Sequence, residues 1–125
     1  MESSELKFSE DHIWVLVLEN RVKLGITEYG QDQLGEAVEF VPVEVETYID
    51  SGDTFGEIES QKAIVELISP ISGMIMNVNE RVLDDPSIIN VDPYGRGWLV
   101  EIELSDEDEI NSLMDEDGYE AFVEE

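Results

Sequence analysis

The sequence predicts a mainly β protein of one domain, spanning residues 1–125, with short helices that include a C-terminal helical segment. Short runs rich in β-branched and aromatic residues recur from residue 12 to residue 104, separated by turn residues. After residue 105 the apolar residues are spaced as on helices. The length of 125 residues and the 42% hydrophobic content suit one core.

Two strands joined by a short turn are predicted first. Residues 12–18 are rich in β-branched and aromatic side chains, and residues 21–26 alternate between polar and apolar. Glu19 and Asn20 lie between them and suit a turn. A hairpin is therefore expected at this point of the chain.

A short helix and a third strand are expected next. Thr27 suits a helix N-cap, Glu28 the positive first turn, and Gly35 the helix end. Residues 38–45 have the composition of a strand. Pro42 within this run indicates an edge strand or a bulge, because proline donates no backbone hydrogen bond.

A second hairpin is predicted in the middle of the chain. Residues 51–53 form a turn, and residues 54–60 and 63–68 are two strands with a tight connection at Gln61 and Lys62. The predictions for the following segment are a break over 69–73, a strand over 74–78, a polar irregular segment over 79–90 and a final strand over 98–104.

The C-terminal segment has helical signals. Residues 105–108 (Ser-Asp-Glu-Asp) resemble a capping box that would begin a helix. Two short helices are expected after it, with one apolar face formed by Ile110, Leu113 and Met114 and the other by Tyr119, Phe122 and Val123.

The charge and the missing cysteines exclude several classes of function. The chain has 32 Asp and Glu against 6 Lys and Arg, a formal net charge of -26. This balance argues against binding nucleic acid or anionic lipid, and is interpreted as a solubility device or as steering of basic partners. Without cysteine there is no disulfide, thiolate ligand or cysteine nucleophile, and no calcium-loop motif is present, so no metal site is expected.

The expected location is the cytoplasm. No apolar stretch approaches the roughly 18 residues of a membrane span. Residues 1–5 have none of the features of a secretory signal. A monomer without membrane attachment is the expected state.

Lys62 is the candidate functional residue. It is one of three lysines and lies at the predicted hairpin tip, where a side chain points into solvent. Residues 55–63 (FGEIESQKA), followed by residues 69–73 (SPISG), resemble the lipoylation hairpin of biotinyl and lipoyl carrier domains. Over about residues 6–124 the chain more closely resembles the H protein of the glycine cleavage system. The matching segments are LGITEYGQ (24–31), LGE (34–36), VNE (78–80), IN (89–90) and DPYGRGWL (92–99).

The resemblance implies a β-barrel-sandwich hybrid and a non-catalytic carrier with lipoic acid in amide linkage on Lys62. Lipoate-attaching enzymes are then expected partners, for which nearby acids such as Glu57 would give an electrostatic handle, unless these acids only form a solvated strand face. His12 could act as a base or make a structural hydrogen bond. Tyr29 could close the pocket that receives the lipoyl-lysine arm, or pack over the helix start. The residues assigned to modification recognition or to the cleft for the arm are Glu59, Ser60, Gln61, Ala63, Glu66, His12, Ile13 and Tyr29.

Two departures from the family pattern bear on the cargo. Ile13 stands where the family has an acid that would accompany a cationic aminomethyl cargo, and Gln61 replaces a usual valine. These differences favour a lipoate-binding protein of heterodisulfide-reductase-like sulfur oxidation, with that complex as partner. The alternatives are a genuine glycine cleavage H protein, working with the P, T and L proteins, and an H-like scaffold without lipoate. An independent enzyme is disfavoured because no nucleophile–base pair is recognisable.

Overall fold

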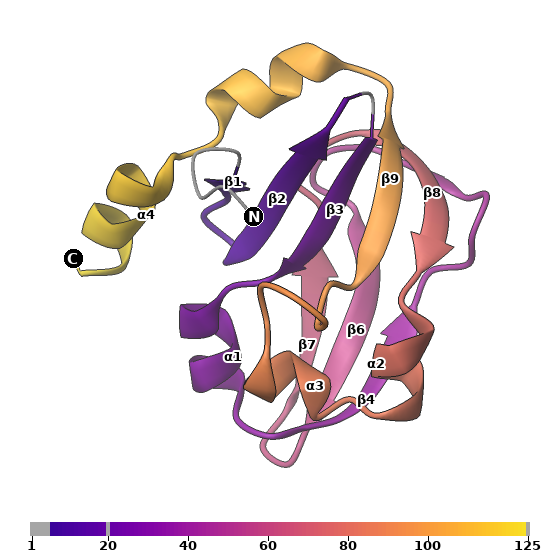
Figure 1. The fold of residues 1–125 in the computed structure, drawn as a ribbon, viewed down its shortest axis with the longest axis vertical. Coiled ribbons are helices and arrows are strands. Elements are labelled where there is room, and N and C mark those ends of the chain that lie inside the picture. Colours follow the sequence, from indigo (N-terminus) through magenta and orange to yellow (C-terminus); the bar gives the residue numbers. More distant parts are fainter. Residues whose placement is uncertain (1–5, 20, 125) are drawn as a thin grey trace.

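Two antiparallel β-sheets form the body of the protein in the computed structural model, which describes residues 6–19 and 21–124. The larger sheet has the strand order β1-β2-β3-β9-β8-β5, and the smaller has the order β4-β6-β7 (Figure 1). The elements in chain order are β1 (Leu6–Phe8), β2 (Ile13–Leu18), β3 (Arg21–Ile26), α1 (Glu28–Leu34), β4 (Ala37–Pro42), β5 (Tyr48–Ile49), β6 (Thr54–Ser60), β7 (Ile64–Ile68), β8 (Gly73–Val78), α2 (Glu80–Asp84), α3 (Ile88–Val91), β9 (Val100–Leu104), the 3₁₀ helix η2 (Glu107–Ser112) and α4 (Glu116–Val123).

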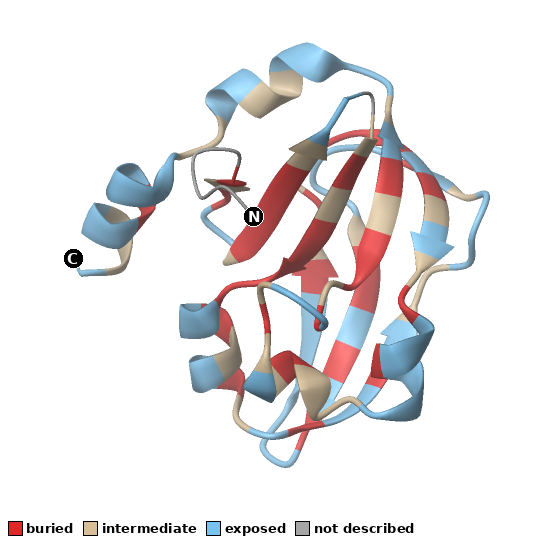
Figure 2. Ribbon diagram, viewed as in Figure 1, coloured by how far each residue is buried: buried red, intermediate tan, exposed pale blue. Residues whose placement is uncertain are grey.

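The main core lies between the two sheets. Phe55 and Ile58 of β6 and Ile75 and Ile102 of β8 and β9 are fully buried, while Glu57 and Glu59 face solvent. This alternation follows from the period of two along a strand. Figure 2 shows buried and exposed residues alternating along β6 in this way. The predicted mainly β fold is therefore confirmed.

Strand β2 is buried on both sides. Ile13 and Val15 belong to the main core, whereas Trp14 and Leu16 belong to a second cluster beneath α4, together with Tyr119. The Trp14 indole also donates a hydrogen bond to the carbonyl of Pro93, 2.9 Å away. Double burial explains why the sequence of β2 is continuously apolar instead of alternating.

Several predicted elements need correction. Residues 79–90, expected to be irregular, contain α2 and most of α3. The Asn79 side chain caps α2 by accepting from the backbone N–H of Arg81. The final strand starts at Val100, two residues later than predicted. The capping residue of the C-terminal segment is Asp106, and the segment after it is a 3₁₀ helix. Strands β1 and β5 have three and two residues, too few to give a periodic signal.

The remaining strand and turn predictions are largely confirmed. Strand β4 ends at Pro42 and pairs only with β6, so the proline does lie on an edge strand. A register shift between Ala37 and Glu39 adds a bulge. Of the predicted turn after β2, Asn20 lies outside the described residues, and Glu19 has the positive φ of 59° that tight turns use.

No helix in the described part of the chain is long and apolar enough to cross a membrane. Within residues 6–19 and 21–124, no three His, Asp or Glu side chains are grouped so that they could hold a metal ion.

Candidate functional site

The hairpin tip between β6 and β7 is folded around Ser60. This side chain is 6% exposed, and its hydroxyl accepts hydrogen bonds from the backbone N–H groups of Lys62 and Ala63, each 3.1 Å away. The same hydroxyl donates to the Ala63 carbonyl at 3.1 Å, and the Ser60 N–H donates to it at 2.8 Å. One buried serine therefore fixes the backbone on both sides of Lys62.

The Lys62 side chain lies beside the end of α1. A Cβ placed on Gly35 would be 3.6 Å from Lys62 Cε, an ordinary contact distance. Gly35 has φ of 84°, which glycine adopts without strain, and it ends α1 with its N–H donating to the Gln31 carbonyl. Next to the lysine, Gln61 Nε2 donates to Glu36 Oε1 at 3.1 Å. The tip is thus held against the connection between α1 and β4.

The Lys62 amine is available for modification. Lys62 is exposed, and in the described residues only Arg21–Glu101 and Arg96–Asp92 form ion pairs. An exposed amine on an ordered tip can enter the active site of a modifying enzyme without local unfolding. The chemistry of a primary amine fits an amide-linked acyl group such as lipoate.

A cavity of about 170 Å³ lies against α1, which ends at Leu34. It follows α1, whose seven residues measure about 10 Å along the helix axis. Of the lining residues, Leu34 precedes Gly35, the residue in contact with Lys62, and Val65 on β7 is three residues after Lys62 in the sequence. The cavity is lined by Asp11, His12, Ile26, Gly30, Gln33, Leu34 and Val65. It is mostly apolar, with the Asp11 carboxylate and the His12 ring at one wall.

His12 is held in a hydrogen-bonded chain that reaches helix α4. Its Nδ1 is 2.8 Å from the Tyr119 hydroxyl, which lies 2.6 Å from Thr27 Oγ1. Thr27 in turn accepts from the N–H of Gly30 and so caps α1. Burial lowers the pKa of His12, and the nearby Asp11 carboxylate opposes this shift. The neutral ring therefore serves as a structural link, which agrees with the hydrogen-bonding alternative stated above.

The other residues predicted for the arm cleft divide into two groups. Glu59, Gln61, Ala63 and Glu66 are exposed around the tip, so a modifying enzyme could contact them. Ser60 is buried and acts through the backbone, as described.

Ile13 and Tyr29, also assigned to the cleft from the sequence, do not line the cavity beside α1. Ile13 is 1% exposed, pairs with Ile26 in the sheet, and belongs to the main core. The Tyr29 ring packs against His12 at 4.8 Å but lines a neighbouring cavity under α4. Sequence reasoning missed Asp11 and Val65, and the only signal for Asp11 was an acid directly before His12.

Comparisons with known proteins agree with this geometry. The family model described as glycine cleavage H-protein matches residues 6–125. The glycine cleavage system H proteins of Staphylococcus haemolyticus and Staphylococcus saprophyticus are each 44% identical over 120 residues, covering 96% of this chain and 95% of the relative.

A solved structure gives the same result. A crystal structure of a glycine cleavage system H protein from Mycobacterium marinum superimposes with a TM-score of 0.89 and 30% identity, covering 98% of both chains. The fold, the lysine hairpin and the full-length matches thus lead to one conclusion: the chain belongs to the glycine cleavage H-protein family, whose members are non-catalytic carriers that hold lipoate on a lysine.

Proposed function

We propose that this protein is a lipoyl carrier of glycine cleavage, with lipoate on Lys62. The observation that carries the proposal is the exposed lysine on a tip ordered by Ser60, in a chain that matches H proteins over its length. A bound lipoyl group would supply a ring that alternates between disulfide and dithiol, chemistry that a chain without cysteine lacks. The proposal includes the cytoplasmic location, the monomeric state and the single domain predicted from the sequence.

The cavity beside α1 gives the cargo a place to rest. Its apolar wall, including Leu34 and Val65, excludes water from one side of the arm, while Asp11 places a carboxylate at the far wall. A cationic amine cargo is stabilised by a carboxylate nearby. We infer that Asp11 supplies the carboxylate for a cationic cargo, which the family pattern would place at the position of Ile13.

The glycine cleavage alternative is the better supported cargo assignment. The sulfur-oxidation reading depended on two departures from the family pattern, at Ile13 and Gln61. Ile13 is part of the core, and the Gln61 side chain donates to Glu36 beside the tip, so neither places a sulfur-specific group at the cavity. All the named relatives above are glycine cleavage system H proteins, and they give no support to a heterodisulfide-reductase-like partner. We infer that the partners are the P, T and L proteins of glycine cleavage and the enzymes that attach lipoate.

Attachment at Lys62 is tested by peptide mapping after incubation with a lipoate ligase and lipoate. The wild-type protein should gain one lipoyl group on the peptide that contains Lys62, and Lys62→Arg should gain none while keeping its melting temperature. Lys23→Arg is the matched control and should be modified as the wild type is. Lipoylation of the Lys62→Arg variant would overturn the assignment.

The role of Asp11 is tested by Asp11→Asn in the lipoylated protein. Since Asp11 is exposed, its interaction with a cation is worth up to about 1 kcal/mol, so spontaneous release of an amine cargo should become about two- to fivefold faster. Asp32→Asn, an exposed acid on α1 outside the cavity, removes the same charge and should leave the rate unchanged. Equal acceleration in both variants would show that Asp11 has no local role.

A further inference from the structure

Half of the basic residues of this acidic protein line one hollow. Three of the six Lys and Arg side chains line an open cavity of about 620 Å³, although the whole chain has a net charge of -26. Asp92 is the one carboxylate in the lining, so the hollow itself is positive. The lining residues are Lys23, Asn79, Arg81, Asp92, Gly95, Arg96 and Trp98. None of them lines the cavity beside α1.

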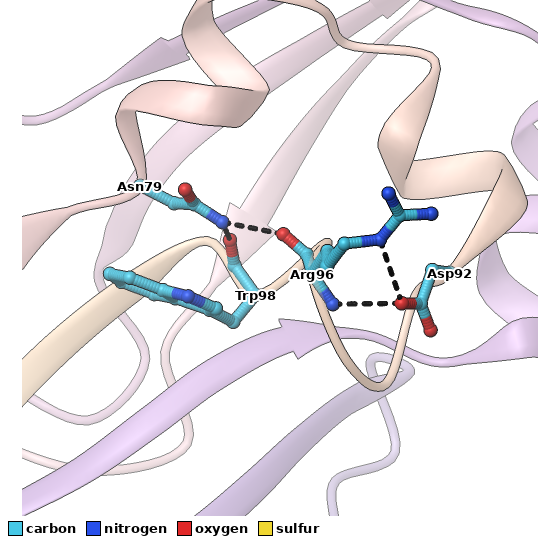
Figure 3. Close-up of polar contacts among 4 residues, drawn as sticks. All are labelled: Asn79, Asp92, Arg96 and Trp98. Atoms are coloured by element: carbon cyan, nitrogen blue, oxygen red, sulfur yellow. Dashed lines mark hydrogen bonds and ion pairs between the residues drawn. The ribbon is translucent and has the colours of Figure 1, made fainter.

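The buried side chain of Asn79 fixes the backbone around this hollow. Asn79 is 4% exposed, and its Nδ2 donates to the carbonyls of Arg96 and Trp98, both 2.7 Å away (Figure 3). Its Oδ1 accepts from the N–H of Arg81 at 3.1 Å. The start of α2 and the loop after α3 are therefore fixed relative to each other. As a result, two arginines from separate elements face one space before any ligand arrives.

The cations of the hollow are incompletely neutralised. Arg96 Nε lies 3.4 Å from the Asp92 carboxylate, which also accepts from the Arg96 N–H at 3.0 Å (Figure 3). These hydrogen bonds hold the pKa of Asp92 below its usual range. Lys23 Nζ stands 4.7 Å from the centre of the Trp98 ring, a cation–π contact. In the described part of the chain neither Lys23 nor Arg81 has a carboxylate within ion-pair distance, despite the 32 acids present.

We propose that this hollow binds a small oxyanion, either a phosphate ester or a polycarboxylate. Guanidinium groups form paired, charge-assisted hydrogen bonds with such oxygens, and the lysine adds a third donor. The ligand is small because an acidic macromolecule would be repelled over its whole surface by a chain of this charge. Short-range contacts from Arg81, Arg96 and Lys23 are what hold it.

The probes for the test are inorganic phosphate and citrate, titrated at constant ionic strength into the full-length protein. Amide and indole NMR signals of residues 79–81 and 92–98 should shift and saturate. Saturation by phosphate alone assigns the phosphate class, and saturation by citrate alone assigns the polycarboxylate class; either result supports the proposal. The proposal is overturned if neither shifts these signals, or if only an oligoglutamate peptide does.

Matched variants separate a local site from the general charge. Arg81→Gln should weaken binding by about tenfold, the loss expected for one charge-assisted hydrogen bond. Arg21→Gln removes the same charge from a residue outside the hollow and should leave the affinity within about twofold. Lys23→Gln and Lys7→Gln form a second pair, and thermal melting checks that each variant is folded. Equal weakening within either pair would refute the proposal.

Discussion

Replacing Ser60 by alanine removes the hydroxyl that shapes the tip and leaves both strands of the hairpin intact. The hydroxyl makes three hydrogen bonds of 3.1 Å, two from the N–H groups of Lys62 and Ala63 and one to the Ala63 carbonyl. The backbone bond from the Ser60 N–H to that carbonyl remains. The variant should therefore loosen the tip without opening the sheet.

The size of the effect follows from the exposure of the partners. Lys62 and Ala63 are exposed, so water replaces part of what their N–H groups lose. With a net value of about 0.5–1.5 kcal/mol for one hydrogen bond, and three bonds sharing one hydroxyl, we expect a cost of about 1–2 kcal/mol. If the cost is confined to the tip, the ratio of ordered to disordered tip falls about 5- to 30-fold. Lipoate attachment should then show a lower kcat/KM, by at most this factor.

The assay measures the rate of lipoate attachment by intact mass, with hydrogen exchange of the Lys62 and Ala63 amides measured in parallel. Ser112→Ala is the control, because this exposed serine also donates to a backbone carbonyl, that of Glu109 at 2.8 Å, far from the tip in sequence. Attachment at the wild-type rate in Ser60→Ala, with faster exchange at the tip, would refute the claim that tip order governs modification.

Three further outcomes concern the layer around His12. Tyr119→Phe keeps the buried ring but removes its hydrogen bonds to His12 and Thr27, so the free energy of unfolding should fall by about 1–3 kcal/mol in urea melts; Tyr29→Phe, on a ring 38% exposed, should change it by under about 0.5 kcal/mol. Because the pKa of His12 is lowered in the folded protein, the unfolded chain takes up a proton first as the pH falls. The stability that neutral His12 contributes should therefore be complete above about pH 6.5 and decline below it. A stability difference between wild type and His12→Asn that stays constant across this range would contradict the expectation. Ile13→Glu would bury an unpaired carboxylate and should cost several kcal/mol in urea melts, whereas unchanged stability would show that the position is open to the cavity.

The lysine hairpin was predictable because its information is local. Residues 54–60 alternate between buried and exposed, and the tip residues Gln61 and Lys62 follow directly, so pattern and turn lie in one short segment. The capping of α1 by Thr27 is local in the same way.

The two cavities could not be derived from such patterns. The cavity beside α1 combines Asp11 with Val65, and the basic hollow combines Lys23 with Arg96, residues that only the sheet topology brings together. Ile13 was assigned to the cleft from the family resemblance. Its place in the core could not be read from the sequence, because β2 is buried on both faces and no alternation shows which face a side chain takes.

Glycine-dependent loading tests the central claim most directly. The protein is lipoylated at Lys62, kept with the lipoyl ring in its disulfide form, and incubated with glycine and glycine decarboxylase. One sulfur of the ring then takes the aminomethyl group as the S–S bond breaks, the other becomes a thiol, CO2 leaves, and the intact mass is measured. The wild-type protein should gain the mass of one aminomethyl group, and Lys62→Arg should gain none. A fully lipoylated protein that gains no such mass, beside a related H protein that does under the same conditions, would contradict its assignment to glycine cleavage.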